Sequence, residues 1–193
     1  MKFKTFFFSI PCIVLLSFLS GCRKEGCTDA NATNYSSGAT KDDHSCIYKP
    51  EIGGYFQGGV VFYIDEMNRR CLIVSPQELT GFGWSDSSYY YGASDTALFT
   101  GERNTLKMIE GRCPVAMACD LYKANGYSDW YLPSRDELAK FMSSKVGENS
   151  FHSRWSSTEI DANRAVTVET DGSFWWDSKF NGNFFRPIRT GTY

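Results

Sequence analysis

Histidine is scarce in this 193-residue sequence, which contains only His44 and His152. The two residues form no His-x-x-x-His pattern, and the cysteines form no Cys-x-x-Cys pair, so the common zinc motifs are missing. A Ser-His-Asp catalytic constellation cannot be argued from two isolated histidines either. The sequence therefore predicts no catalytic residue, no metal site and no cofactor.

An excess of positive charge is missing as well. The chain has 20 Lys and Arg against 22 Asp and Glu, a formal net charge of −2 and a pI of about 5.7. Binding to nucleic acid depends on clustered Lys and Arg that neutralise phosphates. We therefore expect no nucleic acid among the partners of this protein.

Long apolar runs are confined to the N-terminus. Lys2 and Lys4 precede an apolar stretch from Phe6 to Leu19. At about 14 residues this stretch is shorter than the ~20 residues that a membrane-spanning helix needs. A basic start followed by a short apolar segment is typical of a signal peptide. The sequence predicts such a peptide over residues 1–21.

The end of the apolar stretch reads Leu19-Ser20-Gly21-Cys22. This pattern resembles the bacterial lipobox, in which the cysteine receives the lipid. It predicts lipidation at Cys22, with acyl chains that contribute about 0.8 kcal/mol of membrane binding per buried CH₂. We expect a protein held by its lipid in the bacterial cell envelope, in the outer membrane and displayed at the surface. The alternative is an ordinary secretory signal that contains a cysteine.

A short polar module follows, with a cysteine at each end. Residues 26–48 are rich in Asn, Asp, Ser, Thr and Gly and cannot bury a core. Export permits disulfides, and a Cys27–Cys46 bridge would stabilise the module by about 3 kcal/mol. We take residues 22–52 as a lipidated tether that includes this bridge.

The same module contains oxygen-rich side chains that suit calcium. They are Asp29, Asn31, Asp42 and Asp43. Their spacing is not that of an EF-hand loop. The alternative, which we favour, is a solvated spacer in which these residues form Asx turns.

Residues 53–193 contain all five tryptophans and have the length of one ordinary domain. Apolar runs separated by turn residues predict short antiparallel strands. The strands are expected at 60–64, 71–74, 165–169, 173–179 and 184–189, with turns at 65–69, 171–172 and 181–182. The Gly-, Ser-, Tyr- and Asp-rich residues 80–103 are predicted to form a long ordered loop.

Helical patterns predict two main helices and a short one, and hence an α+β fold. Asn104 is expected to cap the short helix, which runs to Glu110. The first main helix covers 114–124, with Gly126 ending it; it places Val115, Ala118, Cys119 and Tyr122 on one face.

The second main helix is predicted to begin with a capping box. Ser134 and Glu137 have the Ser-x-x-Glu spacing of this motif. The apolar residues that follow recur at helical spacing and predict a buried stripe of Leu138, Phe141 and Met142.

Four segments of the domain form a recognisable series: GGVVFYID (58–65), NGYSDWYLPSRDEL (125–138), WSSTE (155–159) and FRPIR (185–189). In this order they resemble the C-terminal domain of the Legionella collagen-like protein, the Lcl family, long called domain of unknown function 1566. Trp130 and Trp155 lie within these segments and are predicted to be core residues.

The resemblance implies a C-type-lectin-like fold of the formylglycine-generating-enzyme type, with a ligand face built from its last strands and loops. Members known to act are adhesins for sulfated glycans, and others are variable proteins of diversity-generating retroelements. This chain departs from the family in lacking a basic surface and in Cys71, where a small residue is common. Cys113 is also unusual, and either Cys71 or Cys113 could form a bridge with Cys119 that the family does not share.

Residues 172–187, GSFWWDSKFNGNFFRP, combine six aromatic residues with short polar ones. Strand alternation places Phe174, Trp176, Ser178 and Phe180 on one face, which we predict to be core. The other face and the following turn are predicted to bind ligand through Ser173, Trp175, Asp177, Lys179, Asn181 and Asn183. A shift of one residue in the strand would exchange the two faces.

Three functions are therefore weighed. The leading one is a lipoprotein that binds an extracellular glycan or protein for adhesion or recognition, without catalysis, as a possible variable protein of a retroelement. The second, implied by the related fold, is an oxidase of the formylglycine-generating type that would use Cys113 and Cys119. The third is a structural envelope lipoprotein without a ligand.

Overall fold

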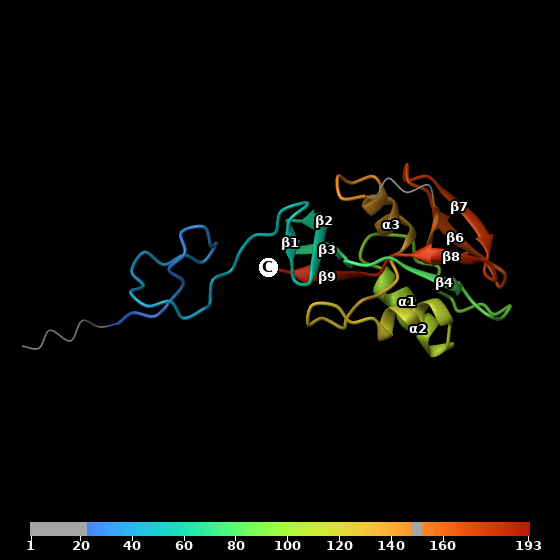
Figure 1. Ribbon diagram of the computed structural model, residues 1–193, viewed down its shortest axis with the longest axis horizontal. Coiled ribbons are helices and arrows are strands. Elements are labelled where there is room, and N and C mark those ends of the chain that lie inside the picture. Colours follow the sequence, from blue (N-terminus) through green and yellow to red (C-terminus); the bar gives the residue numbers. More distant parts are fainter. Residues whose placement is uncertain (1–22, 148–151) are drawn as a thin grey trace, which may run out of the picture. The chain divides into compact units, whose positions relative to one another are not determined.

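A computed structural model describes residues 23–147 and 152–193 of the chain (Figure 1). The chain divides into two compact units, Met1–Ile47 and Tyr48–Tyr193. The expected signal peptide, 1–21, and the lipidation site, Cys22, lie outside the described residues. Among the described helices, none has the length and apolar character needed to cross a bilayer.

The Cys27–Cys46 disulfide is confirmed, with a Cα–Cα distance of 4.8 Å. It closes a module without regular helices or strands among its described residues, 23–47. Hydrogen bonds connect the distant parts of this module. The Thr33 amide donates to the Ile47 carbonyl at 2.7 Å, and the Asn34 side chain accepts from the Ile47 amide at 2.7 Å. The bridge thus stabilises a segment that buries little apolar surface.

The carboxylates of this module form Asx turns. Asp29 accepts a hydrogen bond from the Asn31 amide at 2.9 Å, and Asp43 accepts from the Ser45 amide at 3.0 Å. Side chains bonded to the backbone two residues on are typical of polar turns. In the described part of the chain no group of three or more acidic, His or Cys side chains is arranged to hold a metal ion. The geometry thus matches the spacer alternative.

The second unit is an α+β domain with two sheets. The four-stranded sheet has the order β1-β2-β3-β9, and the five-stranded sheet has the order β4-β8-β5-β6-β7. The strands are β1 (Tyr55–Phe56), β2 (Gly59–Asp65), β3 (Arg70–Val74), β4 (Leu79–Gly83), β5 (Arg154–Glu159), β6 (Arg164–Val168), β7 (Phe174–Ser178), β8 (Gly182–Phe185) and β9 (Ile188–Thr192). The pairs are antiparallel except β5–β8, which is parallel.

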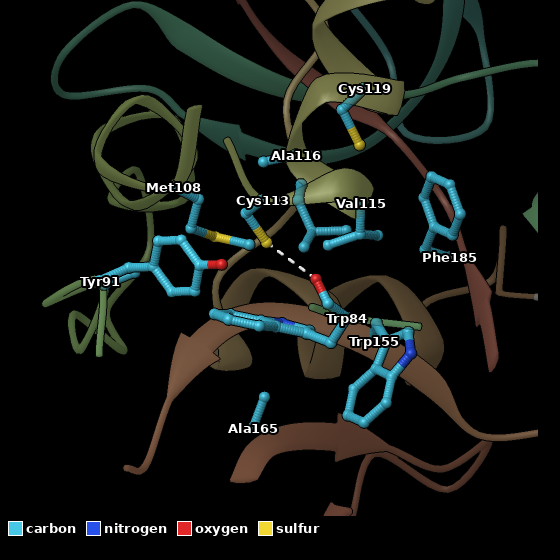
Figure 2. Packing of buried hydrophobic residues seen from close by; sticks show 12 residues of the cluster. Trp84, Tyr91, Met108, Cys113, Val115, Ala116, Cys119, Trp155, Ala165 and Phe185 are labelled. Carbon is cyan, nitrogen blue, oxygen red and sulfur yellow. Dashed lines mark hydrogen bonds between the residues drawn. The ribbon is translucent and has the colours of Figure 1, made fainter. Parts of the chain in front are cut away.

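Three helices cover the sheets: α1 (Gly101–Glu110), α2 (Pro114–Leu121) and α3 (Arg135–Met142). One apolar cluster joins α1 and α2 to Trp155 and Ala165 of the five-stranded sheet and to Trp84, which follows β4 (Figure 2). A second cluster joins α3 to Val166 and Val168, which point to the opposite face of β6. The five-stranded sheet is therefore packed on both faces, as its fully buried strand β5 shows.

The structure corrects the helix predictions near residue 100. α1 begins at Gly101 after Thr100 and is the longest helix, so the domain has three comparable helices and not two. Asn104 does not cap it; Asn104 is buried within the helix, and its side-chain amide donates to the Asp95 carbonyl at 2.7 Å. β4 lies inside the stretch that was predicted to be a loop.

Gly126 does not end α2. The helix stops at Leu121, because Tyr122 already has an extended backbone. Asn125 and Gly126 have φ values of 53° and 85° and connect a bridge between Ala124 and Tyr127. Positive φ at both central residues is typical of a type I′ turn, for which Asn-Gly is the preferred sequence.

The single closing strand predicted at 184–189 is two strands in different sheets. β8 pairs within the five-stranded sheet, and β9 pairs with β3 in the other. Pro187 lies between them and has no amide hydrogen for a sheet ladder, so the chain changes sheets there. Its carbonyl accepts from the Ser75 amide at 3.0 Å.

The capping box of α3 is confirmed. The Ser134 side chain accepts from the Glu137 amide, and the Glu137 carboxylate accepts from the Ser134 amide at 2.7 Å. Leu138, Phe141 and Met142 are buried as predicted. This helix start is fixed by both local and tertiary contacts, since the Ser134 hydroxyl also donates to the Ala97 carbonyl at 2.8 Å.

Ser134→Ala is expected to lower the free energy of unfolding by about 1–2 kcal/mol, because a helix loses its N-cap and a buried carbonyl loses its donor. Chemical denaturation of the wild type and the variant measures the difference. The exposed Ser143, at the other end of α3, provides the control: Ser143→Ala should change stability by less than about 0.5 kcal/mol. Equal effects of the two substitutions would contradict the capping role.

Candidate functional site

β7 is an edge strand that exposes three consecutive aromatic side chains. Phe174, Trp175 and Trp176 have exposed fractions of 53%, 66% and 57%. The strand pairs with β6 on one side and ends the order of the five-stranded sheet on the other (Figure 1). The prediction that Phe174, Trp176 and Phe180 form core is therefore wrong: both faces of β7 lie at the rim of the domain, and Phe180 is 52% exposed.

The pairing with β6 assigns the faces of β7. Trp175 lies opposite Thr167 and Asp177 opposite Ala165, so their side chains lie on the face covered further in by α1 and α2. Phe174 and Trp176 lie opposite Val168 and Val166, on the face that packs against α3. Large apolar side chains on both faces of an exposed strand are rare in a monomer and indicate an interaction surface.

On the α3 side, each aromatic ring is covered by a guanidinium group. Arg135 lies over Phe174 at 4.6 Å from the ring centroid, and Arg164 lies over Trp176 at 4.7 Å. Both arginines also contact a neighbouring carboxylate, as Arg164 does with Asp161 at 2.6 Å. Such cation–π contacts hold the rings in fixed positions. The surface is therefore ordered although it is exposed.

On the Trp175 side, short polar residues precede and follow Trp175 on the same face of the strand. Asp177 accepts hydrogen bonds from the Ser178 amide at 2.7 Å and from the Asn181 side chain at 2.8 Å. Ser173 is exposed, and its amide donates to Asp171 at 2.8 Å. Ser173, Trp175, Asp177 and Asn181 are thus brought together beside one strand and its turn, as the sequence predicted.

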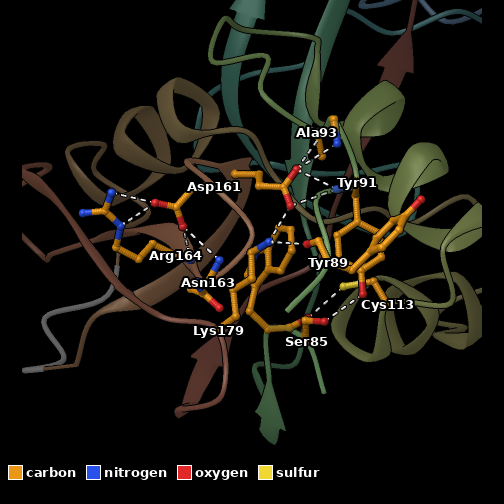
Figure 3. A network of polar contacts seen from close by, with 12 residues as sticks. Ser85, Tyr89, Tyr91, Ala93, Cys113, Asp161, Asn163, Arg164 and Lys179 are labelled. Carbon is orange, nitrogen blue, oxygen red and sulfur yellow. Dashed lines mark hydrogen bonds and ion pairs between the residues drawn. The ribbon is translucent and has the colours of Figure 1, made fainter. Parts of the chain in front are cut away.

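Lys179 does not belong to this surface. Its side chain is completely buried and forms an ion pair with the equally buried Glu159 (Figure 3). The ammonium group also donates to the Tyr89 carbonyl at 2.9 Å and lies 4.6 Å from the centroid of the Trp84 ring. Its predicted ligand contact is therefore wrong, because a charged partner and two aromatic rings draw the side chain inward.

Glu159 is the centre of this polar network. Its carboxylate accepts from the amides of Tyr91 at 3.0 Å, Gly92 at 2.8 Å and Ala93 at 3.3 Å, in addition to Lys179. These contacts hold the irregular chain between β4 and α1 against the end of β7. Tyr89 and Tyr90, which lie in that segment, are 56% and 52% exposed, and the Tyr89 ring packs against Tyr91 with centroids 4.8 Å apart.

Asn183 is separated from the other predicted ligand residues by its own contacts. It lies on β8, is half-buried and donates to the Ser153 hydroxyl at 3.0 Å. Its amide oxygen accepts from the Phe184 amide at 2.8 Å. The arginines that cover the rings, Arg135 and Arg164, were not predicted as part of the surface; the spacing of Asp161 and Arg164 on one turn was the available signal.

Three cysteines of the domain are free thiols, and all are buried: Cys71, Cys113 and Cys119. Burial raises the pKa of Cys113 to about 12 and that of Cys71 to about 11, and it raises the pKa of Cys119 well above its ordinary value. Cys113 donates to the Trp84 carbonyl at 2.8 Å and packs within the aromatic core (Figure 2). Reactive cysteines have exposed sulfur and a low pKa, so these thiols have the properties of core residues.

No family model matches this chain, and no curated protein shows a significant sequence match to it. The resemblance to the Lcl family therefore stays a prediction. The structure does give physical roles to the residues that carry it. Trp130 and Trp155 are buried, as predicted, at 2% and 0% exposure. Glu137 and Glu159 each bind three backbone amides.

Proposed function

We propose that this protein is a lipid-anchored recognition protein of the bacterial cell envelope, whose second unit binds an extracellular glycan or protein ligand. The observation that carries the proposal is the row of three aromatic side chains on β7, each more than half exposed. A folded domain gains nothing in stability from leaving two tryptophans in water. Their exposure is explained if a ligand covers them.

The chemistry around Trp175 suits a sugar or a polar protein surface. The indole offers a flat apolar face, and the hydroxyl of Ser173, the carboxylate of Asp177 and the amide of Asn181 offer donors and acceptors next to it. Rigid aromatic anchors surrounded by short polar side chains are typical of paratope-like surfaces. These four residues are the ligand contacts that we propose.

Buried contacts fix the position of β7 and the turn after it, which lowers the entropic cost of binding a ligand there. The buried Lys179–Glu159 pair fixes the turn after β7 to the segment that carries Tyr89. On the opposite sheet, Arg189 forms a bidentate ion pair with Asp129, with both distances at 2.7 Å. That contact joins the second and the last of the four sequence segments, which supports a C-type-lectin-like scaffold of the formylglycine-generating type.

The oxidase alternative receives less support. It requires accessible thiols, whereas Cys113 and Cys119 are buried and burial raises the pKa of both. A ligand-free structural protein gives no role to the exposed Trp175 and the polar side chains of Ser173, Asp177 and Asn181 near it. Recognition is therefore the function that the geometry supports best.

Lipid anchoring at Cys22 is tested by fractionation of cells that express the wild type or Cys22→Ser. We expect the wild type in the membrane fraction and the variant outside it, because loss of the acyl chains removes the membrane affinity. Cys12→Ser, within the same apolar stretch, is the matched control and should stay with the membrane. A Cys22→Ser protein that still needs detergent for extraction would contradict the lipid anchor.

Ligand binding is tested by screening the wild-type protein against immobilised glycans and extracellular proteins. We expect saturable binding to a defined class of either. Absence of binding at any ligand density would favour the structural alternative.

A further inference from the structure

The free edge of β7 presents backbone groups as well as side chains. Backbone hydrogen bonds at both ends of the β6–β7 pair show which residues of β7 face β6. At one end, the Glu169 amide donates to the Ser173 carbonyl at 2.8 Å. At the other end, the Lys179 amide donates to the Asn163 carbonyl at 2.9 Å. In an antiparallel ladder, the bonded residues alternate with residues whose amides and carbonyls point away. The odd-numbered residues of β7 therefore bond to β6.

The even-numbered residues point their amides and carbonyls to the open edge. Ser178 already satisfies both groups within the turn: its amide donates to Asp177, and its carbonyl accepts from the Asn181 amide at 3.0 Å. The outward amides and carbonyls of Phe174 and Trp176 face no further strand of the described residues, because β7 ends the order of the five-stranded sheet. The edge therefore offers two residues with a donor and an acceptor each.

β7 has few of the features that protect edge strands, and its one charged residue is Asp177. Natural edges commonly contain proline, lysine or a bulge that prevents pairing with another strand. The described strand Phe174–Ser178 has the sequence FWWDS, and its register with β6 runs without a shift from Val168↔Phe174 to Arg164↔Ser178. Three neighbouring aromatics on such an edge would favour strand addition.

We propose that the occupant of this edge is β7 of a second copy of the protein, paired antiparallel about a two-fold axis that passes between the two Trp175 residues. Phe174 of each copy lies opposite Trp176 of the other, and each of these pairs exchanges two backbone hydrogen bonds. The two five-stranded sheets become one continuous sheet. This inference rests on the proposed function, because the two Trp175 rings then form a single ligand surface.

The choice of register follows from the free backbone groups. With Phe174 opposite Trp176, all free amides and carbonyls of both edges are paired. A shift by one hydrogen-bonded step would place Trp176 opposite itself and Phe174 opposite Ser178, whose groups are already bonded within its own turn. Buried backbone groups without partners are costly, so the first register is preferred.

Side chains and charge also suit a second copy. The proposed register places aromatic rings opposite aromatic rings on both faces of the sheet, an arrangement that stabilises cross-strand pairs. Arg135 and Arg164 approach the junction, but each is paired with its own aspartate, so the two copies do not repel through them. An extended peptide from another protein would meet the same edge without this symmetric match.

The area buried between the two copies indicates how strongly they should associate in solution and on a membrane. Phe174 and Trp176 bury about 150–250 Å² each when covered and are about half covered already, so they contribute on the order of 200 Å² per copy, while Trp175 keeps its outer face for ligand. Stable interfaces bury about 800 Å² per partner. The pair is therefore expected to be weak in dilute solution and populated on a membrane, where tethering raises the effective concentration toward the mM range.

The test uses the full chain in cell membranes and two cysteine variants with different tags. In the proposed register, Ser173 lies opposite Asp177 of the second copy at a non-hydrogen-bonded position, with a Cα distance of about 4.5 Å that permits a disulfide. Mild oxidation of cells that co-express Ser173→Cys and Asp177→Cys should give a cross-linked species that carries both tags, at least tenfold above either variant alone. In a single variant the two cysteines lie about 13 Å apart at ~3.3 Å per residue.

A third substitution tests the backbone contacts. Trp176→Pro removes an amide that points to the open edge and leaves the ladder to β6 intact. Adding it to both cysteine variants should reduce the mixed cross-link to the level of the single variants, while thermal melts show that the domain stays folded. Equal cross-linking in mixed and single samples, or a mixed cross-link that survives Trp176→Pro, would overturn the proposal. Failure of the cross-link, with ligand binding shown by the wild-type protein, would overturn the pairing alone.

Discussion

Glu159→Ala should lower the free energy of unfolding by about 3–5 kcal/mol, the range observed when one partner of a buried ion pair is removed. Glu159 and Lys179 are both completely buried. The substitution leaves an ammonium group without its counter-charge. It also leaves the amides of Tyr91, Gly92 and Ala93 without their acceptor. Chemical denaturation with a tryptophan signal measures the loss.

Two further variants accompany this prediction. One is a control, and the other should lose less stability than Glu159→Ala. Asp161→Ala removes an exposed carboxylate from the adjacent turn and should change stability by less than about 1 kcal/mol. Lys179→Met should cost less than Glu159→Ala, since the carboxylate keeps its three amide donors. A Glu159→Ala protein as stable as Asp161→Ala would mean that the network does not organise this end of the domain.

The second large effect is a dependence of stability on pH through Glu137. Burial raises the pKa of this carboxyl from its ordinary value of 4.5 to about 7, although it accepts bonds from the amides of Ser134, Phe99 and Gly101. The folded state therefore holds a proton that the unfolded chain releases at lower pH. The stabilisation is complete below about pH 4.5 and is lost as the pH rises through about 7, and it amounts to on the order of 3 kcal/mol.

Denaturant unfolding at pH 5 and pH 7.5 tests this prediction. The wild type should be less stable at the higher pH, and Glu137→Gln, which cannot titrate, should show a smaller difference between the two conditions. Aspartates bonded to arginines, such as Asp129 beside Arg189, have a lowered pKa. Their effect on the free energy of unfolding therefore falls at a pH below the range from 5 to 7.5. A pH slope that is identical in Glu137→Gln would show that another group produces it.

Local signals in the sequence predicted much of the fold. The capping box of α3, the β6–β7 hairpin at Asp171-Gly172 and the Cys27–Cys46 bridge each depend on residues close in the chain or on cysteines that frame a coreless segment. Trp130 and Trp155 were predicted to be core because large aromatic side chains are mostly buried. These predictions needed no knowledge of the sheet order.

The errors at the candidate site have a common physical origin. Alternation along β7 separates its two faces correctly, but whether a face is covered depends on the position of the strand in the sheet. β7 is at the edge, so Trp176 stays exposed on the face that was predicted to be core. Burial of Lys179 depends on Glu159, 20 residues away, and on the carbonyl of Tyr89, 90 residues away. No local pattern contains such contacts.

The central claim, that the β7 aromatic surface binds the ligand, is tested most directly by measuring the affinity of Trp175→Ala for a ligand identified in the binding screen. Tyr55→Ala is the matched control, because Tyr55 is 65% exposed and Trp175 is 66% exposed, but Tyr55 lies in the other sheet. We predict that Trp175→Ala loses about 1–3 kcal/mol of binding free energy, roughly a 5- to 150-fold weaker Kd, with an unchanged melting temperature. Tyr55→Ala should bind like the wild type. Wild-type affinity in a folded Trp175→Ala protein would contradict the assignment of this surface.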